Sequence, residues 1–253
     1  MSSIWHYRAL ARHVEHHRVE PEPARHASAC RSGASGATGV LAGILLSGPL
    51  SLALVSATHP QPPWQGARVF ADAYHPIQLL PYLGGIVLVV ALVVLIASAR
   101  ELASEVHKAR AGAALVLSSV FAALIFFNYV VQTTFLPDLA WHYDEAYAAI
   151  IGAFSMSNPT SLAWGIEMWG WGLLGMATWL VAPVFRGSRL ERATSLVFAA
   201  NGAVSVAGAL LTRGSPGLGD DPGGTHRLPR MEPASDGARS ARVGRLSPAR
   251  QEP

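Results

Sequence analysis

IQLLPYLGGIVLVVALVVLIASA, residues 77–99, is the strongest clue to the architecture of the chain, because its 23 residues are mostly apolar and none is charged. At 1.5 Å per residue, a helix of this length spans the ~30 Å hydrocarbon core of a bilayer. Soluble core helices rarely stay apolar on every face over such a length. The stretch therefore predicts a transmembrane helix, and Pro81 lies in its first turns, where it removes few hydrogen bonds.

Four further apolar runs of similar length precede and follow this stretch. They cover residues 38–58, 111–136, 159–185 and 193–211. Pro137 is expected to end the third span, and Asn158-Pro159 is a typical N-cap and first residue for the fourth. The sequence thus predicts an all-α integral membrane helical bundle, with five transmembrane helices in residues 35–212 and the lipid bilayer as its main partner.

The charged residues are unevenly distributed along the chain. Of 35 charged residues, 8 lie in residues 1–34 and 12 in residues 213–253, which leaves 15 for the 178 residues between them. Both ends also lack apolar periodicity, so we expect a disordered cytoplasmic leader over 1–34 and a disordered polar tail over 213–253. A start of translation downstream of Met1 is the other interpretation of the leader.

Lysine and arginine are concentrated in alternate connecting segments. Along the chain the counts are five in 1–34, one in 59–76, three in 100–110, none in 137–160 and three in 186–192. The positive-inside rule places the segments with many positive charges in the cytoplasm. The N-terminus is therefore predicted to be cytoplasmic, and the loops 59–76 and 137–160 to lie outside. With 18 arginines and one lysine, the chain suggests a GC-rich gene and the cell membrane of a prokaryote.

The tail after Leu211 contradicts this pattern, because five spans would place its seven arginines outside. One interpretation is a disordered extracytoplasmic tail. The other is a frameshift: with allowed codons, Gly217 to Pro253 read in a shifted frame can encode a long apolar stretch with a basic end. A sixth transmembrane helix would then return the C-terminus to the cytoplasm.

Glu167 is the one clear ionisable residue within a predicted span, ~12 Å from its outer end. The third span runs the opposite way and places Asn128 and Gln132 on one face, ~12 and ~6 Å from the same end. Gln78 opens the second span there, and His75 lies just above it. A carboxylate at this depth is costly unless it is paired, protonated or hydrated. The sequence therefore predicts a ligand-binding polar cluster in the outer leaflet.

Two interpretations of this cluster remain open. Glu167 either binds a cation or exchanges a proton, or it forms interhelical hydrogen bonds with Asn128 and Gln132 as a protonated acid. Four tryptophans of the same span are expected to face lipid and the membrane interface as anchors; they are Trp164, Trp169, Trp171 and Trp179. Asn201 in the fifth span is expected to form a helix–helix hydrogen bond.

Several classes of site and partner have no support in the sequence. The single cysteine, Cys30, excludes an intrachain disulfide. No cofactor or metal site is predicted, and the charge pattern indicates no nucleic-acid partner. Small residues at four-residue spacing predict close helix packing, and hence a helix–helix partner or a homo-oligomer through Gly39, Gly43, Ala199 and Ala203.

Three segments of the chain resemble a group of small prokaryotic multi-pass membrane proteins of unknown function. They read NYVVQTTFLP, SNPTSLAWGIEMWGWGLLGMATWLVAPVF and FAANGAVSVAGAL, within residues 37–211. The resemblance implies one further hydrophobic span after the Asn-Gly segment, where this chain departs from the group. It implies no activity and no site residue.

These observations predict a non-catalytic membrane protein that binds, conducts or senses a small solute or cation through the polar cluster. A membrane-embedded enzyme acting on a lipid, with Glu167 as acid or base, is one alternative. A structural subunit of a membrane complex is the other. An enzyme needs a second titratable group near Glu167, whereas a subunit tolerates its loss.

Overall fold

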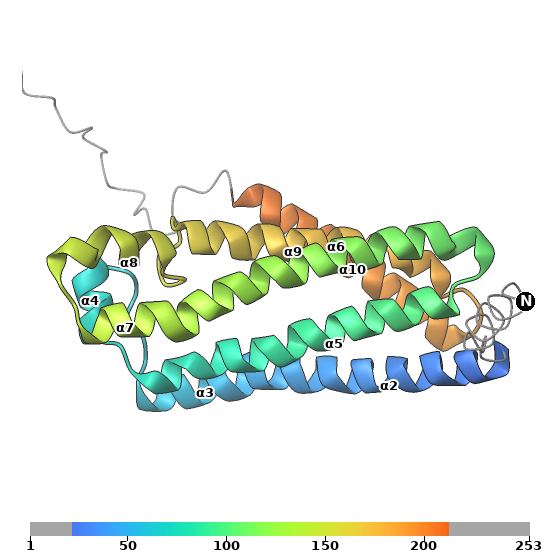
Figure 1. Ribbon diagram of the computed structural model, residues 1–253, viewed down its shortest axis with the longest axis horizontal. Coiled ribbons are helices and arrows are strands. Elements are labelled where there is room, and N and C mark those ends of the chain that lie inside the picture. Colours follow the sequence, from blue (N-terminus) through green and yellow to red (C-terminus); the bar gives the residue numbers. More distant parts are fainter. Residues whose placement is uncertain (1–21, 213–253) are drawn as a thin grey trace, which may run out of the picture. The chain divides into compact units, whose positions relative to one another are not determined.

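A computed structural model of the chain describes residues 22–212, and this range is all helical, without strands (Figure 1). The helices in chain order are α2 (Glu22–Ser47), α3 (Pro49–Thr58), α4 (Ala67–Asp72), η1 (Pro76–Leu79), α5 (Leu80–Leu102), α6 (Glu105–Val130), η2 (Val131–Phe135), α7 (Leu136–Trp141), η3 (Glu145–Tyr147), α8 (Ala148–Phe154), α9 (Leu162–Val181), η4 (Ala182–Val184) and α10 (Arg189–Leu211). The predictions for residues 1–21 and for the tail 213–253 lie outside the described residues.

Four helical segments of the described chain are long and apolar enough to cross a membrane. They are Pro23–Thr58, Pro76–Leu102, Glu105–Trp141 and Arg189–Leu211. They correspond to four of the five predicted spans. The predicted span over 159–185 contains the 20-residue helix α9, in which four tryptophans, four glycines and Glu167 lower the hydropathy. Five spans were expected, and four helices of the described chain are both long enough and apolar enough to cross a membrane; α9 is long enough but less apolar.

The long helices pack in a series of neighbouring pairs. α2 lies along α5, α5 packs on α6, α6 on α9, and α9 on α10. Buried apolar side chains of α5, α6 and α9 form the interior, with Ile96, Phe121, Ile125 and Val181 almost fully enclosed. Many leucines and valines on α2, α3 and α10 are exposed, which is the distribution expected where lipid covers the outer faces.

The small residues of the first span pack inside the chain. A Cβ atom on Gly39 would lie 2.8 Å from the Ala91 Cβ, and one on Gly43 would lie 2.5 Å from the Leu88 Cα. These glycines allow the backbone of α2 to approach α5 closely. The face predicted for a partner or a second copy is therefore covered by α5 of the same chain.

In the last span, the alanines predicted for close packing, Ala199 and Ala203, do not bring the backbone of α10 close to α9 in the way that Gly39 and Gly43 do for α2 and α5. The side of α10 that meets α9 carries Gly202 and Ala209, whereas Ala203 is exposed. The Ala199 carbonyl accepts a hydrogen bond from Trp179 Nε1 at 2.7 Å. Close α9–α10 packing thus uses Gly202, one position before Ala203, together with Ser205 and Ala209 further along the helix.

The loops 59–76 and 137–160, which the charge pattern places on the same side of the membrane, pack against each other at one end of the helices. α4 from the first loop contacts α7 and α8 from the second. Their buried residues include Phe70, Leu136 and Ile151. In Figure 1 these short helices lie at the opposite end from the start of α2. We call α4, α7 and α8 the cap.

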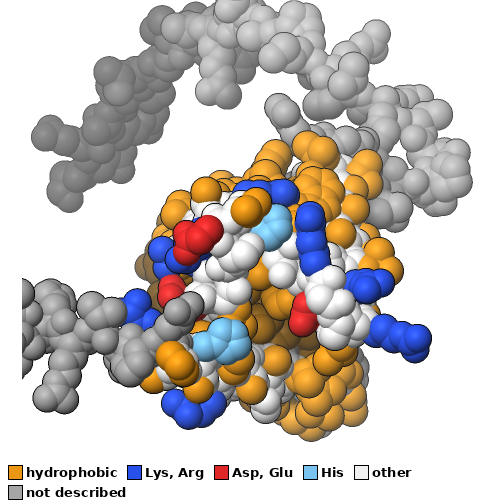
Figure 2. Space-filling view, turned by 90° about the vertical axis from the view of Figure 1, so that its right-hand side faces the viewer, with side chains coloured by type: hydrophobic (Ala, Val, Ile, Leu, Met, Phe, Trp, Pro, Cys, Tyr) orange, Lys and Arg blue, Asp and Glu red, His pale blue; other side chains and the backbone are white. Residues whose placement is uncertain are grey.

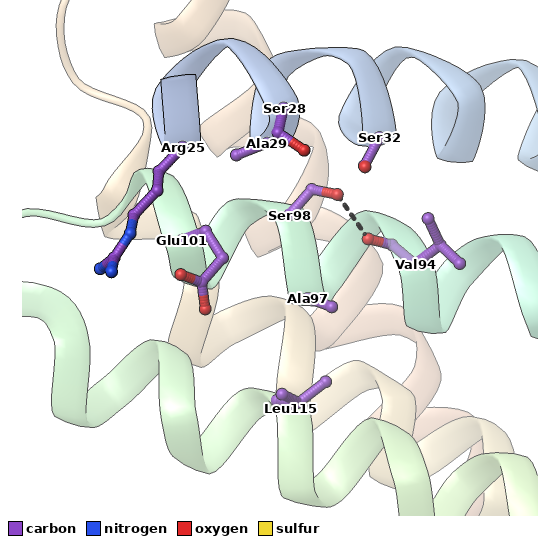
Figure 3. Close-up of a pocket in the computed structure, with 9 residues that line it drawn as sticks. All are labelled: Arg25, Ser28, Ala29, Ser32, Val94, Ala97, Ser98, Glu101 and Leu115. Atoms are coloured by element: carbon purple, nitrogen blue, oxygen red, sulfur yellow. Dashed lines mark hydrogen bonds between the residues drawn. The ribbon is translucent and has the colours of Figure 1, made fainter. Parts of the chain in front are cut away.

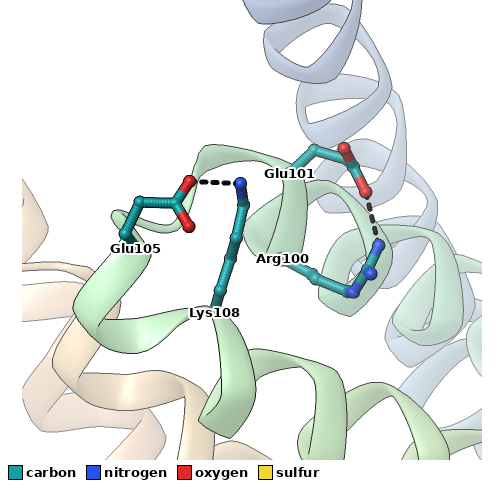
Figure 4. Close-up of polar contacts among 4 residues, drawn as sticks. All are labelled: Arg100, Glu101, Glu105 and Lys108. Atoms are coloured by element: carbon teal, nitrogen blue, oxygen red, sulfur yellow. Dashed lines mark hydrogen bonds and ion pairs between the residues drawn. The ribbon is translucent and has the colours of Figure 1, made fainter.

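The opposite end of the helices is charged. Figure 2 shows arginine, lysine, histidine and acidic side chains gathered there, with hydrophobic side chains around them. Arg100 donates to Glu101 at 2.7 Å, and Lys108 pairs with Glu105 beside the turn between α5 and α6 (Figure 4). The partners in both pairs are largely exposed, so we expect each pair to contribute little stability.

Helix boundaries differ from the sequence predictions at three places. α2 is already helical at Glu22, although a leader without regular structure was expected up to residue 34. Ala29 is buried, and a Cβ on Gly33 would lie 3.5 Å from the Ser98 Cβ, so packing on α5 accounts for this extension. The third span continues past Pro137 into α7. The Asn158-Pro159 pair forms a turn, and the N-cap of α9 is Ser161.

Candidate functional site

Glu167 lies near the start of α9 and is 6 % exposed. Its carboxylate accepts three hydrogen bonds, and all three donors are neutral. Asn128 Nδ2 donates to Oε2 at 2.9 Å. The Tyr129 hydroxyl and Trp171 Nε1 donate to Oε1 at 3.1 and 2.8 Å. Each carboxylate oxygen therefore has a partner, and the acid joins α6 to α9.

No basic side chain within residues 22–212 pairs with Glu167, since the ion pairs of that range all involve other acids. The site is a buried acid with hydrogen-bond donors but no counter-ion of its own in the described chain.

Asn128 and Gln132, which the four-residue spacing placed on one face, lie one turn apart and also contact each other. Gln132 Nε2 donates to Asn128 Oδ1 at 3.4 Å and to the Phe154 carbonyl at 2.8 Å. Gln132 Oε1 accepts from the Met156 backbone N–H at 3.2 Å. The two amides thus connect the carboxylate to the turn between α8 and α9, which closes the site on the side of the cap.

A π-helical turn, η2, follows Tyr129 and contains Gln132. Pro137 has no N–H to donate to the carbonyl four residues earlier, so the regular pattern cannot continue through it. Thr133 Oγ1 donates to the Tyr129 carbonyl at 2.7 Å, and Thr134 Oγ1 donates to the Val130 carbonyl at 2.6 Å. These hydroxyls are additional donors to carbonyls just before the π turn, one turn ahead of the carbonyl that Pro137 leaves without an N–H partner. The helix continues through the π turn into the cap.

Tyr129 is held against Glu167 by close packing with α5. A Cβ on Gly85 would overlap the Tyr129 ring, so only glycine leaves room for the phenol. The Tyr82 ring, also from α5, meets the Tyr129 ring edge-on, with centroids 5.5 Å apart. A helix outside the α6–α9 pair thus fixes the position of one of the three donors.

Gln78 and His75 do not contact Glu167, although the sequence grouped them with it. Gln78 Nε2 donates to the carbonyls of His59 and Ala73 at 3.2 and 3.0 Å, and its Oε1 accepts from the His75 N–H at 3.3 Å. The His75 ring stacks on His59 with centroids 3.5 Å apart. Both residues cap the start of η1 and fasten the preceding loop.

A cavity of about 20 Å³ lies between this capping group and the Glu167 cluster. Its polar lining comes from Gln61, Tyr74, Gln78, Tyr82 and Gln132. The Tyr74 hydroxyl oxygen is buried and has no hydrogen-bond partner among the described residues. Burial raises the pKa of Tyr74 above its ordinary value, so the hydroxyl keeps its proton and can donate. The volume corresponds to about one water molecule.

Two of the three donors to Glu167 are absent from the sequence prediction. Trp171 was predicted to face lipid, but its indole donates to the acid and packs on Phe121. Its position four residues after Glu167 on the same helix face is a signal that could have identified it. Tyr129 had no comparable signal, because its orientation depends on the absence of a side chain at Gly85.

Comparison with known proteins adds no functional information. No protein-family model matches the chain, and the searches of curated proteins and of solved structures also gave no significant match. The candidate site therefore stands on its geometry alone.

Proposed function

We propose that the chain is a multi-pass protein of the cell membrane that binds a proton or a small cation at Glu167. In this proposal α9 also spans the membrane, which gives five spans in all, because it packs between α6 and α10, which are both candidate spans. The N-terminus is cytoplasmic and the cap faces outward, in line with the lysine and arginine counts of the loops.

The observation that carries the proposal is the environment of Glu167. A buried acid inside a membrane span is costly, and such residues commonly mark ion or proton sites. Three neutral donors orient this carboxylate without neutralising it. A bound proton or a small cation would supply the positive charge that the carboxylate of Glu167 lacks.

The polar cavity supports access from the side of the cap. Gln132 both lines the cavity and donates to Asn128, which donates to Glu167. A volume of about 20 Å³ fits a species of the size of water and is far smaller than typical sites for organic ligands. The proposal therefore excludes larger solutes from this route.

Binding is favoured over catalysis by the enclosure of the acid. The Tyr129 hydroxyl is a second titratable group beside Glu167, as an enzyme would need, so access for a substrate is the observation that separates the two functions. Acid–base catalysis on a lipid needs a substrate within hydrogen-bond reach of the catalytic group. The carboxylate is instead enclosed by protein donors, and the adjoining cavity is too small for a lipid headgroup.

Trp171 provides a direct test, because its indole touches the carboxylate. The purified protein in lipid nanodiscs would be titrated with acid, and separately with Na⁺ or NH₄⁺, while tryptophan fluorescence is recorded. We expect a saturable change that is absent in Glu167→Gln and strongly reduced in Trp171→Phe. Trp169→Phe is the matched control, because Trp169 lies on the same helix and is 43 % exposed.

A structural role makes the opposite prediction. If Glu167 only joins two helices, Glu167→Gln keeps the fold and the wild-type fluorescence does not depend on pH or on either cation. That result would refute the proposed site. A titration that survives in Glu167→Gln would equally refute it, because the signal would then come from another group.

A further inference from the structure

A second site lies at the charged end of the helices, away from Glu167. A pocket of about 390 Å³ opens between α2, α5 and α6 (Figure 3). Its polar lining consists of Arg25, Ser28, Ser32, Ser98 and Glu101. The Ser98 hydroxyl donates to the Val94 carbonyl at 2.8 Å, so its oxygen lone pairs remain as acceptors. The pocket thus presents a cation, an anion and several hydroxyls.

Arg25 and Glu101 extend side by side from α2 and α5 in Figure 3. No carboxylate of residues 23–212 lies within 4.0 Å of the Arg25 guanidinium. Glu101 Oε1 accepts from Arg100 at 2.7 Å, and the described ion pairs leave Oε2 unused (Figure 4). A ligand with adjacent negative and positive groups would complement Arg25 and Glu101.

An apolar groove follows directly after this pocket along the same two helices. It also measures about 390 Å³ and is lined by residues that include Gly36, Gly39, Val87 and Val90. Val94 lines both the pocket and the groove, so the two spaces adjoin. The glycines lie at the close contact of α2 with α5, and the groove runs along the outer side of that contact, where Val87 and Val90 are partly exposed.

The length of the combined site matches one leaflet of a bilayer. Arg25 and Gly39 are fourteen residues apart on one helix, which is ~21 Å along the axis. Half of a bilayer with its headgroups measures about 20–22 Å. The polar end therefore lies at headgroup depth when the apolar groove lies among acyl chains.

We propose that this groove binds one phospholipid molecule with an ethanolamine headgroup. The Arg25 guanidinium and the Ser28 hydroxyl bind the phosphate, and Glu101 accepts from the primary ammonium. One acyl chain lies along Val87 and Val90 between α2 and α5. Choline carries no N–H to donate, so the site discriminates against phosphatidylcholine, and phosphatidylglycerol lacks the cation that faces Glu101.

Native mass spectrometry of the full chain tests this assignment. The protein in detergent would be incubated with equal amounts of phosphatidylethanolamine, phosphatidylcholine and phosphatidylglycerol, and the retained lipid would be counted. We expect phosphatidylethanolamine to dominate. Arg25→Gln should lower its retention by about tenfold, since hydrogen bonds to charged groups are among the stronger ones. Glu101→Gln should remove the preference over phosphatidylglycerol.

The acyl groove is tested separately with Val90→Trp, which fills the groove at a position 49 % exposed. Its control is Val116→Trp, which lies on α6 and is 63 % exposed, and the control for Arg25→Gln is Arg110→Gln at the same end. We expect only Arg25→Gln and Val90→Trp to lose lipid. Equal retention of the three lipids, or an unchanged count in Val90→Trp, overturns the proposal. Displacement of the lipid by millimolar inorganic phosphate would identify a phosphate site and would overturn it too.

Discussion

The indole Nε1 of Trp171 lies 2.8 Å from the carboxylate Oε1 of Glu167, one turn earlier on the same helix. This contact shows that the tryptophans of α9 do not all serve as membrane anchors. A tryptophan expected to anchor the protein in lipid instead turns its polar atom toward a buried acid. The remaining donors, Asn128 and Tyr129, come from α6. The acid is thereby oriented by one partner on its own helix and two on a neighbouring helix.

Trp171→Phe removes the donor and keeps a ring that can still pack on Phe121. We expect a loss of about 1–3 kcal/mol in the free energy of unfolding, because a buried acceptor loses one of its partners. Thermal unfolding in detergent, followed by circular dichroism, measures the effect. Trp169→Phe serves as the control. If both variants unfold at the same temperature, the hydrogen bond to Glu167 contributes no stability.

Gly85→Ala tests whether α5 positions Tyr129. The added methyl group would overlap the Tyr129 ring, and overpacking of this kind costs about 1–3 kcal/mol. Gly165→Ala is the matched helical control, because a Cβ there has no neighbour within 4 Å. In a Tyr129→Ala background, Gly85→Ala should cost less, with a coupling of about 0.5–3 kcal/mol. Additive effects in this cycle would mean that the two residues do not contact.

Gly202→Ala tests the packing of α10 on α9. A Cβ on Gly202 would overlap the Trp179 indole, which donates to the Ala199 carbonyl at 2.7 Å. We expect Gly202→Ala to separate the two helices and to lower the unfolding temperature. Gly208→Ala should be neutral or stabilising, because nothing lies within 4 Å and alanine favours helix by up to ~1 kcal/mol. The reverse order of stabilities would show that this helix pair is arranged differently.

The proposed orientation is testable with single cysteines in a Cys30→Ser background. A cysteine at Asp144 lies in the loop before α8, and one at Glu105 lies at the start of α6. A membrane-impermeant maleimide added to intact cells should label the first cysteine and not the second. Both should react after the membrane is opened. Labelling of Glu105→Cys alone in intact cells would reverse the proposed topology.

The sequence was informative wherever a residue's role depends on its own helix. The apolar run 77–99 coincides closely with η1 and α5, and the four-residue spacing of Asn128 and Gln132 places them on one face, where they also contact each other. Asn201 was expected to make a helix–helix hydrogen bond, and its Nδ2 donates to Thr178 Oγ1 at 3.3 Å. Local periodicity and polarity suffice for such predictions.

Other features depend on contacts between helices that the sequence does not reveal. Pro137 was expected to end a helix, but the helix continues past it through a π turn. Gln78 and His75 were grouped with Glu167 by depth, yet Gln78 is directed to loop carbonyls instead. The depth of a residue in the membrane fixes its position along the helix axis, but not the direction in which its side chain points. Which helices are neighbours, and which faces meet, is decided by packing.

Binding of a proton or a small cation at Glu167 is measured most directly by infrared difference spectroscopy of the protein in lipid vesicles, because the carboxyl and carboxylate forms absorb at different frequencies. Spectra would be recorded across pH and on addition of Na⁺ or NH₄⁺, with Glu167→Gln as the reference. We predict a carboxyl signal that changes with pH or with the added cation and is missing in Glu167→Gln. Identical difference spectra for the two proteins under every condition would contradict the claim.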